Sequence, residues 1–139
     1  YIAMHKQGKP QTMQDDIAYK DVVLDVSTYL SKKKEHCALL GINDVILDIG
    51  LGFGKTREHN FTLIKNLKHF QALGLPLLIG LSRKSMIYRT LGVTPQEAIN
   101  GTTFLHAFAL QGGAHILRVH DVKEAKECAR LWQKLNATG

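Results

Sequence analysis

The sequence predicts a parallel α/β fold, and three observations support this. Four short segments are continuously apolar, each is followed by apolar residues at helical spacing, and each ends in polar residues. The apolar segments are residues 1–4, 45–48, 77–80 and 116–119. Apolar runs without alternation are typical of parallel strands covered on both faces. Right-handed crossovers at this spacing build either an open doubly wound sheet or part of a (β/α)8 barrel, which typically needs about 250 residues.

The first strand–helix unit occupies residues 1–40. A polar loop follows the first apolar segment and extends to about residue 16. From residue 17 to residue 40 the apolar positions recur at helical spacing, which predicts a helix. Gly41 supplies the left-handed residue that commonly ends a helix.

The remaining units repeat this order without an internal linker. A glycine-rich loop, residues 50–55, follows the second strand, and a helix is expected over residues 60–73. After the third strand we expect a short helix and then a longer one over residues 96–111. The fourth strand leads into a closing helix whose apolar positions run from Val122 to Leu135. The whole chain is therefore expected to form one domain.

Composition narrows the class of protein. With 139 residues, 45% of them hydrophobic, the chain has the composition of a soluble domain. Cys37 and Cys128 lie in helical segments away from any C-x-x-C pair, which favours a reduced, cytoplasmic protein. No apolar run reaches the roughly 20 residues that span a bilayer, so no membrane association is expected. The net charge of +6 is spread over several helices. A positive charge favours anionic ligands, but a solvated basic surface is the preferred interpretation, and there is no nucleic-acid signature.

Polar side chains follow each predicted strand, where ligands of parallel α/β proteins bind. Arg118 lies in an otherwise apolar strand, so it either pairs with an internal aspartate or binds an anion. His120 lies two residues later on the same strand face, which favours anion binding. Asp48 could accept two N–H groups from a guanidine-type heterocycle, with Lys84 expected opposite.

Other motifs are weaker. Gly54-Lys55-Thr56 resembles the end of a phosphate-binding Walker A loop, but Ile49 stands where that motif needs its first glycine. The loop also lacks the third glycine of the dinucleotide fingerprint, so a tight turn is the simpler interpretation. The segment Ser82–Ser85 is expected to begin a helix, where the serines either bind an anion or cap the helix. The seven histidines lack the spacing of metal ligands, so no metal site is expected in this chain.

Taken together, these segments resemble the dihydropteroate synthase family. The resemblance rests on Met4-His5 with residues 8–14, Asp48-Ile49-Gly50-Leu51-Gly52-Phe53-Gly54-Lys55-Thr56, Ser82-Arg83-Lys84-Ser85 and Arg118-Val119-His120-Asp121-Val122, in the family's order and spacing. Ile49 is one departure, because the family usually has proline after this aspartate. The family's first four βα units, with an Asn-x-Thr-Pro-Asp-Ser-Phe loop and a Ser-Thr-Arg-Pro-Gly loop, are not in this sequence.

The resemblance implies a (β/α)8 TIM barrel of which this chain supplies the last four βα units, residues 1–139 being the C-terminal half of a pterin-binding domain. It implies condensation of 6-hydroxymethyl-7,8-dihydropterin pyrophosphate with p-aminobenzoate in folate biosynthesis, by a homodimeric sulfonamide target. It also implies that Mg2+ takes part, held by a protein ligand in the missing half. The implied pterin contacts are Met4, Asp48, Gly80, Lys84 and Arg118, and the implied p-aminobenzoate contacts are Phe53 and Ser85. Arg118 and His120 are implied to bind pyrophosphate, and with Lys84 they are the implied catalytic residues.

Two alternatives stay open. A pterin-dependent methyltransferase domain has a similar barrel and pterin pocket, but it requires neither a pyrophosphate site nor Ser85. A non-catalytic half-barrel could bind a pterin or an anion without performing chemistry. The isolated chain is expected to be inactive because the loops that cover the substrates lie in the missing half.

Overall fold

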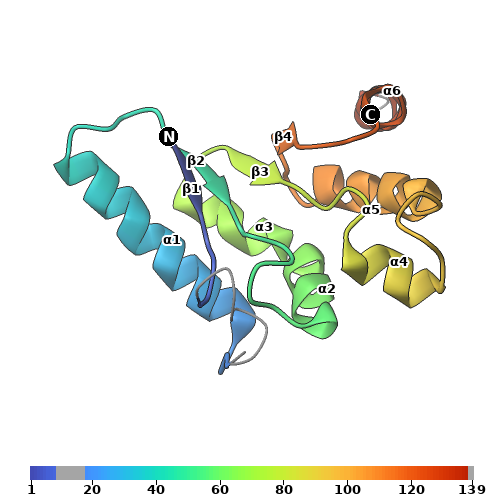
Figure 1. Ribbon diagram of the computed structural model, residues 1–139. Coiled ribbons are helices and arrows are strands. Elements are labelled where there is room, and N and C mark those ends of the chain that lie inside the picture. The colour runs from blue at the N-terminus through green and yellow to red at the C-terminus, as the bar shows by residue number, and fades with distance from the viewer. Residues whose placement is uncertain (9–17, 138–139) are drawn as a thin grey trace.

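The computed structural model describes residues 1–8 and 18–137 (Figure 1). Most of the predicted motif at residues 8–14 therefore lies outside the described residues. The elements, in chain order, are β1 (Ile2–Met4), α1 (Val22–Leu39), β2 (Ile46–Asp48), α2 (Arg57–Lys65), α3 (Leu67–Phe70), the 3-10 helix η1 (Gln71–Leu73), β3 (Leu77–Ile79), α4 (Ser85–Leu91), α5 (Ile99–Gln111), β4 (Ile116–Leu117) and α6 (Val122–Asn136).

The four strands form one parallel sheet in the order β1-β2-β3-β4. The predicted parallel α/β class is thus confirmed, with each strand beside its neighbour in sequence as in part of a (β/α)8 barrel. The register places Met4 opposite Asp48 and Asp48 opposite Leu78. All strands run the same way, so their carboxyl ends meet at one edge of the sheet. From this edge the loops after β2, β3 and β4 lead into α2, α4 and α6 (Figure 1).

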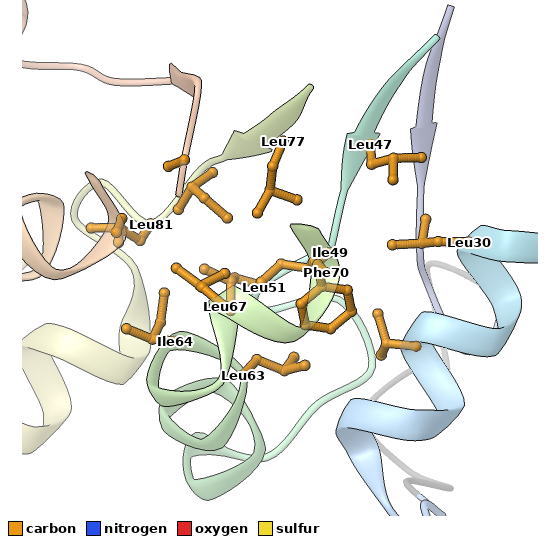
Figure 2. Packing of buried hydrophobic residues seen from close by; sticks show 14 of the residues in the cluster. Leu30, Leu47, Ile49, Leu51, Leu63, Ile64, Leu67, Phe70, Leu77 and Leu81 are labelled. Atoms are coloured by element: carbon orange, nitrogen blue, oxygen red, sulfur yellow. The ribbon is translucent and has the colours of Figure 1, made fainter. Parts of the chain in front are cut away.

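The core lies between the sheet and the helices packed on one of its faces. Side chains from β2 and β3 meet side chains from α1, α2 and α3 there (Figure 2). The largest fully buried members of this cluster include Leu30, Leu47, Leu63, Phe70 and Leu77. Ile49, which stands where the family usually has proline, is also fully buried and packs in this cluster.

The other face of the sheet is partly uncovered, as expected for half of a barrel, although Leu78 of β3 is buried there. Alternate residues of a strand point to opposite faces. Ala3 faces the helices and is 2% exposed, whereas its neighbour Ile2 is 51% exposed. Ile116 of β4 is 37% exposed, and Leu135 of α6 is 74% exposed. The described residues therefore leave apolar surface uncovered at both ends of the sheet.

Several element boundaries differ from the prediction. Helix α1 begins at Val22 instead of residue 17 because the Asp21 side chain accepts the free N–H groups of Val23 and Leu24. The expected helix over residues 60–73 begins earlier, after the capping residue Thr56, and is divided at Asn66 into α2, α3 and η1.

Two further boundaries differ in the second half of the chain. The helix expected from residue 96 begins at Ile99, and β4 ends at Leu117 instead of residue 119. Arg118 and His120 consequently lie in the loop after β4, and they do not share a strand face.

Both cysteines, Cys37 and Cys128, are buried free thiols. In the described part of the chain, no helix is both long enough and apolar enough to cross a membrane.

His106, on α5, is a buried group that weakens the fold. It is 2% exposed, and neither ring nitrogen has a hydrogen-bond partner among the described residues. Burial lowers the pKa of His106 below the ordinary value of 6.5, although the charge of Asp121 opposes this shift. As the pH falls below 6.5, His106 takes up a proton in the unfolded chain, whereas in the folded chain its lowered pKa keeps the ring neutral to a lower pH. The free energy of unfolding therefore falls as the pH decreases.

We expect His106→Leu to raise the free energy of unfolding by about 1–2 kcal/mol, because it removes an unsatisfied buried polar group. The gain should grow as the pH falls through the ordinary histidine value of 6.5, since leucine cannot titrate. Urea unfolding of the variant, with the exposed His69→Leu as control, measures both effects. A less stable His106→Leu protein with unchanged pH dependence contradicts this account.

Candidate functional site

Polar groups from the loops after β3 and β4 meet at the carboxyl edge of the sheet, beside Asp48 at the end of β2. They surround a small cavity of about 100 Å3, lined by Gly80, Ser82, Lys84, Arg118, Val119 and His120. Lys84, Arg118 and His120, all predicted as site residues, thus share one cavity. The Asp48 carboxylate lies next to it, because its Oδ2 is 4.0 Å from Nη2 of Arg118.

Asp48 is held firmly, and Arg118 is not. Asp48 ends β2, is 4% exposed, and accepts the N–H of Gly50 on Oδ1 at 2.8 Å. The Arg118 side chain is 57% exposed, which corrects the expectation of a buried guanidinium. At 4.0 Å the two charges are too far apart for a charge-assisted hydrogen bond. The guanidinium can therefore still donate to an anionic ligand.

Arg83 and Asp121 join the loop after β3 to the loop after β4. The Arg83 guanidinium donates to both carboxylate oxygens of Asp121, at 2.8 and 2.6 Å. This bidentate pair lowers the pKa of Asp121. Arg83 adopts a left-handed backbone with φ of 52°, and its own N–H donates to Thr102 Oγ1 at 3.0 Å. This link places Lys84 and Arg118 at the same cavity.

Ser82 orients the His120 ring. Its hydroxyl oxygen accepts the backbone N–H of His120 at 3.2 Å and lies 3.0 Å from Nδ1 of the ring. A hydroxyl that accepts one hydrogen bond can donate its own proton to Nδ1, which places the ring proton on Nε2. Nε2 is then the nitrogen that can donate to a ligand. Ser82 is therefore a side-chain partner of His120. The predicted helix start at Ser82 is also too early, because helix α4 begins at Ser85, with Lys84 at the N-cap position.

Lys84 contacts the glycine loop from across the cavity. Its ammonium donates to the Leu51 carbonyl and lies 4.8 Å from the centre of the Phe53 ring. Burial lowers the pKa of Lys84 to about 8; the Arg118 charge adds to this shift and the Asp48 charge opposes it. Lys84 and Phe53, which the resemblance assigns to the pterin and to p-aminobenzoate respectively, thus lie side by side.

Sequence reasoning missed a buried lysine below the glycine loop. Lys55 is 3% exposed, and its ammonium lies 2.9 Å from His5 Nδ1 while donating to the carbonyls of Gly50 and Phe53 at 2.8 and 3.1 Å. Burial lowers the pKa of Lys55 to about 7, with Asp48 raising it and Lys84 lowering it. Burial and the Lys55 charge lower the pKa of His5 to about 4.

The remaining predicted residues lie around this cluster. Met4 is half-buried beside Asp48 in the sheet register. Gly80 leaves room for Arg118, since a Cβ there would lie 2.6 Å from Nη2 of that side chain. Ser85 does not line the small cavity. It lines a second cavity of about 490 Å3 together with Gly52, Lys55, Thr56, Arg57, Asn60, Met86, Tyr88 and Arg89.

A metal site does not fit the described residues. They contain no group of three or more histidine, cysteine, aspartate or glutamate side chains placed to hold an ion. Asp48, the buried carboxylate of the site, already accepts an N–H and faces the cations Lys84 and Arg118. A cluster with this charge favours an anionic ligand and disfavours a divalent cation.

The fold and the site define a half-barrel α/β protein with a cationic pocket at the carboxyl ends of its strands. Residues 1–120 match a protein family described as pterin binding enzyme. The chain belongs to the pterin-binding enzyme family.

The relatives and solved structures bear the name that the sequence motifs suggested. The chain is 45% identical over 130 residues to dihydropteroate synthase of Escherichia coli K12, covering 92% of this chain and 46% of the relative. A Yersinia pestis dihydropteroate synthase in a sulfonamide drug complex superposes with a TM-score of 0.96 at 37% identity, covering 99% of this chain and 51% of that one.

The dihydropteroate synthase of Thermus thermophilus has been solved with 4-aminobenzoate and, separately, with 6HMPPP. Both structures match with a TM-score of 0.93 at 39% identity, covering 97% of this chain and 56% and 55% of theirs. The predicted resemblance is thereby confirmed. The chain spans about half the length of the proteins it matches.

Proposed function

We propose that this chain is the C-terminal half of a dihydropteroate synthase, and that residues 1–139 supply the last four βα units of its barrel. The complete enzyme condenses 6-hydroxymethyl-7,8-dihydropterin pyrophosphate with p-aminobenzoate to give 7,8-dihydropteroate and pyrophosphate. The observation that carries this proposal is the shared position of Asp48, Lys84, Arg118 and His120. One carboxylate and three basic groups meet at one strand edge.

Asp48 and Lys84 suit the two edges of a pterin. The 2-amino group and the adjacent ring N–H form a pair of donors that a carboxylate accepts side by side. Lys84, whose charge faces the same space, donates to the pterin carbonyl and ring nitrogen. Met4 lies beside Asp48 in the sheet register, and the absence of a side chain at Gly80 leaves room for Arg118 to stack on the pterin ring.

Arg118 and His120 suit the departing pyrophosphate. The reaction breaks the bond between the pterin methylene carbon and the pyrophosphate oxygen, and the p-aminobenzoate nitrogen forms a bond to the same carbon and then loses a proton. Negative charge grows on the leaving oxygen as the bond breaks. The exposed guanidinium of Arg118 and the Nε2–H of His120 stabilise that charge, so catalysis is mainly positioning and anion stabilisation.

Phe53 and Ser85 flank the path of the second substrate. The Phe53 ring packs beside the Lys84 ammonium, and Ser85 follows Lys84 directly at the start of α4. An aromatic acid lying against Phe53 can place its carboxylate near the Ser85 hydroxyl. The basic lining of the adjacent cavity, which includes Arg57 and Arg89, favours a negative charge at that end.

A pterin-dependent methyltransferase is the second candidate function for this fold. It needs a pterin pocket, but it has no pyrophosphate to stabilise. The exposed Arg118 and the oriented His120 favour the synthase, because they supply anion contacts that a methyl transfer does not use.

Three properties complete the proposal. The protein is cytoplasmic, in keeping with its two free buried thiols. It is a homodimer, supported by the exposed Phe104 and Phe108 of α5, which line an apolar cavity of about 470 Å3. Any Mg2+ that takes part is held by the first half of the domain, because the described residues here do not fit that ion.

The test of this function is a turnover assay of the complete protein that contains this chain. We expect dihydropteroate and pyrophosphate to form in equal amounts, and only when both substrates are present. Pterin binding without product contradicts the proposal and favours a binding half-barrel. Methyl transfer from a methylated pterin favours the second candidate.

Gly80→Ala tests the assigned position of Arg118 without removing its charge. The new methyl group overlaps the Arg118 guanidinium, which must move away from the strand edge. We expect KM for the pterin pyrophosphate to rise by about tenfold, because small misplacements of a positioned group are costly. The melting temperature should change little, since the displaced atoms end a flexible side chain. An unchanged KM contradicts the position given to Arg118.

A further inference from the structure

We propose that Lys55, the last residue of the glycine-rich loop, is a positioning residue for the second substrate, because it fixes residues 50–54 of that loop in the conformation that presents Phe53. This inference rests on the proposed function of the loop. Lys55 lies behind the loop, and its role is to act through Phe53.

The glycine loop needs such a support. Gly50, Gly52 and Gly54 all have left-handed backbones, with φ of 66°, 82° and 64°. Glycine reaches these angles easily but also reaches many others, so the loop loses much conformational freedom when it is ordered. Asn60 Oδ1 accepts the N–H of Gly52 at 2.8 Å, and the Tyr19 hydroxyl donates to the Gly54 carbonyl at 2.9 Å.

Lys55 holds the inner carbonyl groups of the same loop. Its ammonium donates to the oxygens of Gly50 and Phe53, and His5 Nδ1 accepts the third hydrogen bond. The three N–H groups of one lysine thus match three acceptors from two different βα loops. If Lys55 loses its proton, the His5 ring can donate from Nδ1 instead, so the three contacts survive in either protonation state.

Close packing against the end of β1 fixes the position of the loop at Gly50. A Cβ at Gly50 would lie only 1.7 Å from the His5 carbonyl oxygen, so the loop packs directly on the end of β1. The far side of the loop contacts Lys84 through the Leu51 carbonyl and the Phe53 ring. A change at Lys55 therefore reaches Phe53 and its contact with Lys84. Asp48 is the last residue of β2, so the strand holds it in addition to the Gly50 N–H, and Arg118 directly follows β4. Both therefore depend less on the rest of the loop than Phe53 does.

The test uses Lys55→Met in the complete protein, with the exposed Lys123→Met as a matched control. We expect KM for p-aminobenzoate to rise by about tenfold or more, because Phe53 is no longer fixed. KM for the pterin pyrophosphate should change by less than about threefold, and Lys123→Met should match the wild type. Hydrogen exchange at the Phe53 amide, which donates to the Gly50 carbonyl, should become at least about tenfold faster.

His5→Phe is the second variant, because it removes only one of the three acceptors and keeps the aromatic packing against Tyr29. It should raise KM for p-aminobenzoate less than Lys55→Met does. If Lys55→Met does not fold, a rise in this KM for His5→Phe supports the inference and an unchanged KM contradicts it. Equal rises in both KM values, or no rise for p-aminobenzoate, overturn the inference. If the wild type forms no product, the proposed function fails. Exchange at Phe53 then shows whether Lys55 fixes the loop.

Discussion

Arg118→Ala should lower kcat/KM for the pterin pyrophosphate by about 30- to 1,000-fold in the complete protein. The guanidinium is the exposed cation of the site and is not tightly paired with Asp48. Removing a charge-assisted contact to the leaving group costs on the order of 2–4 kcal/mol of transition-state stabilisation. The loss should appear in kcat as well as in kcat/KM, because the negative charge on the leaving oxygen grows in the transition state.

Arg130→Ala provides the control, since Arg130 is an exposed arginine on α6 and lies outside the cavity. Arg130→Ala removes the same charge as Arg118→Ala, and its kcat/KM should equal that of the wild type. Steady-state kinetics with the pterin pyrophosphate varied at saturating p-aminobenzoate measure both variants. If Arg118→Ala retains the wild-type kcat/KM, pyrophosphate does not bind at Arg118.

The second large effect is a complete loss of product when this chain is assayed alone. Among the described residues, the sheet ends in β1 and β4, which each pair with another strand on one side only, and the apolar side chains of Ile2 and Ile116 are exposed. Unpaired strand edges and exposed apolar surface favour self-association or pairing with a complementary half. We therefore expect the isolated chain to be oligomeric or poorly soluble, and inactive.

Adding the first half of the barrel as a separate polypeptide should restore monodisperse protein and product formation together. Native mass spectrometry and the turnover assay can be run on the same samples. A monomeric 15.5 kDa chain that turns over both substrates at ordinary enzymatic rates contradicts the half-site account.

The sequence predicted the sheet well because its strands depend on local signals. Each apolar run is short, continuous and followed by a helical pattern, and the structure pairs all four in sequence order. The position of the candidate site followed from the same pattern, since parallel strands end at one edge. Helix boundaries were less predictable. Asp21 and Thr56 set two of them through local capping hydrogen bonds that compete with the apolar periodicity.

The contacts that assemble the site were not predictable in this way. Lys55 and His5 are 50 positions apart, and Arg83 and Asp121 are 38 apart, so only the folded chain brings each pair together. The signal for Lys55 was a lysine directly after three closely spaced glycines. Arg118 was expected inside a strand, but β4 ends one residue before it.

The most direct test of the central claim is a crystal structure of the complete protein with the pterin pyrophosphate bound. The account predicts the pterin donor edge on the Asp48 carboxylate, and the pyrophosphate against Arg118 and the Nε2 side of His120. It also predicts the bidentate pair between Arg83 and Asp121 unchanged. A ligand bound with its pyrophosphate away from Arg118, or with its pterin edge away from Asp48, contradicts the account.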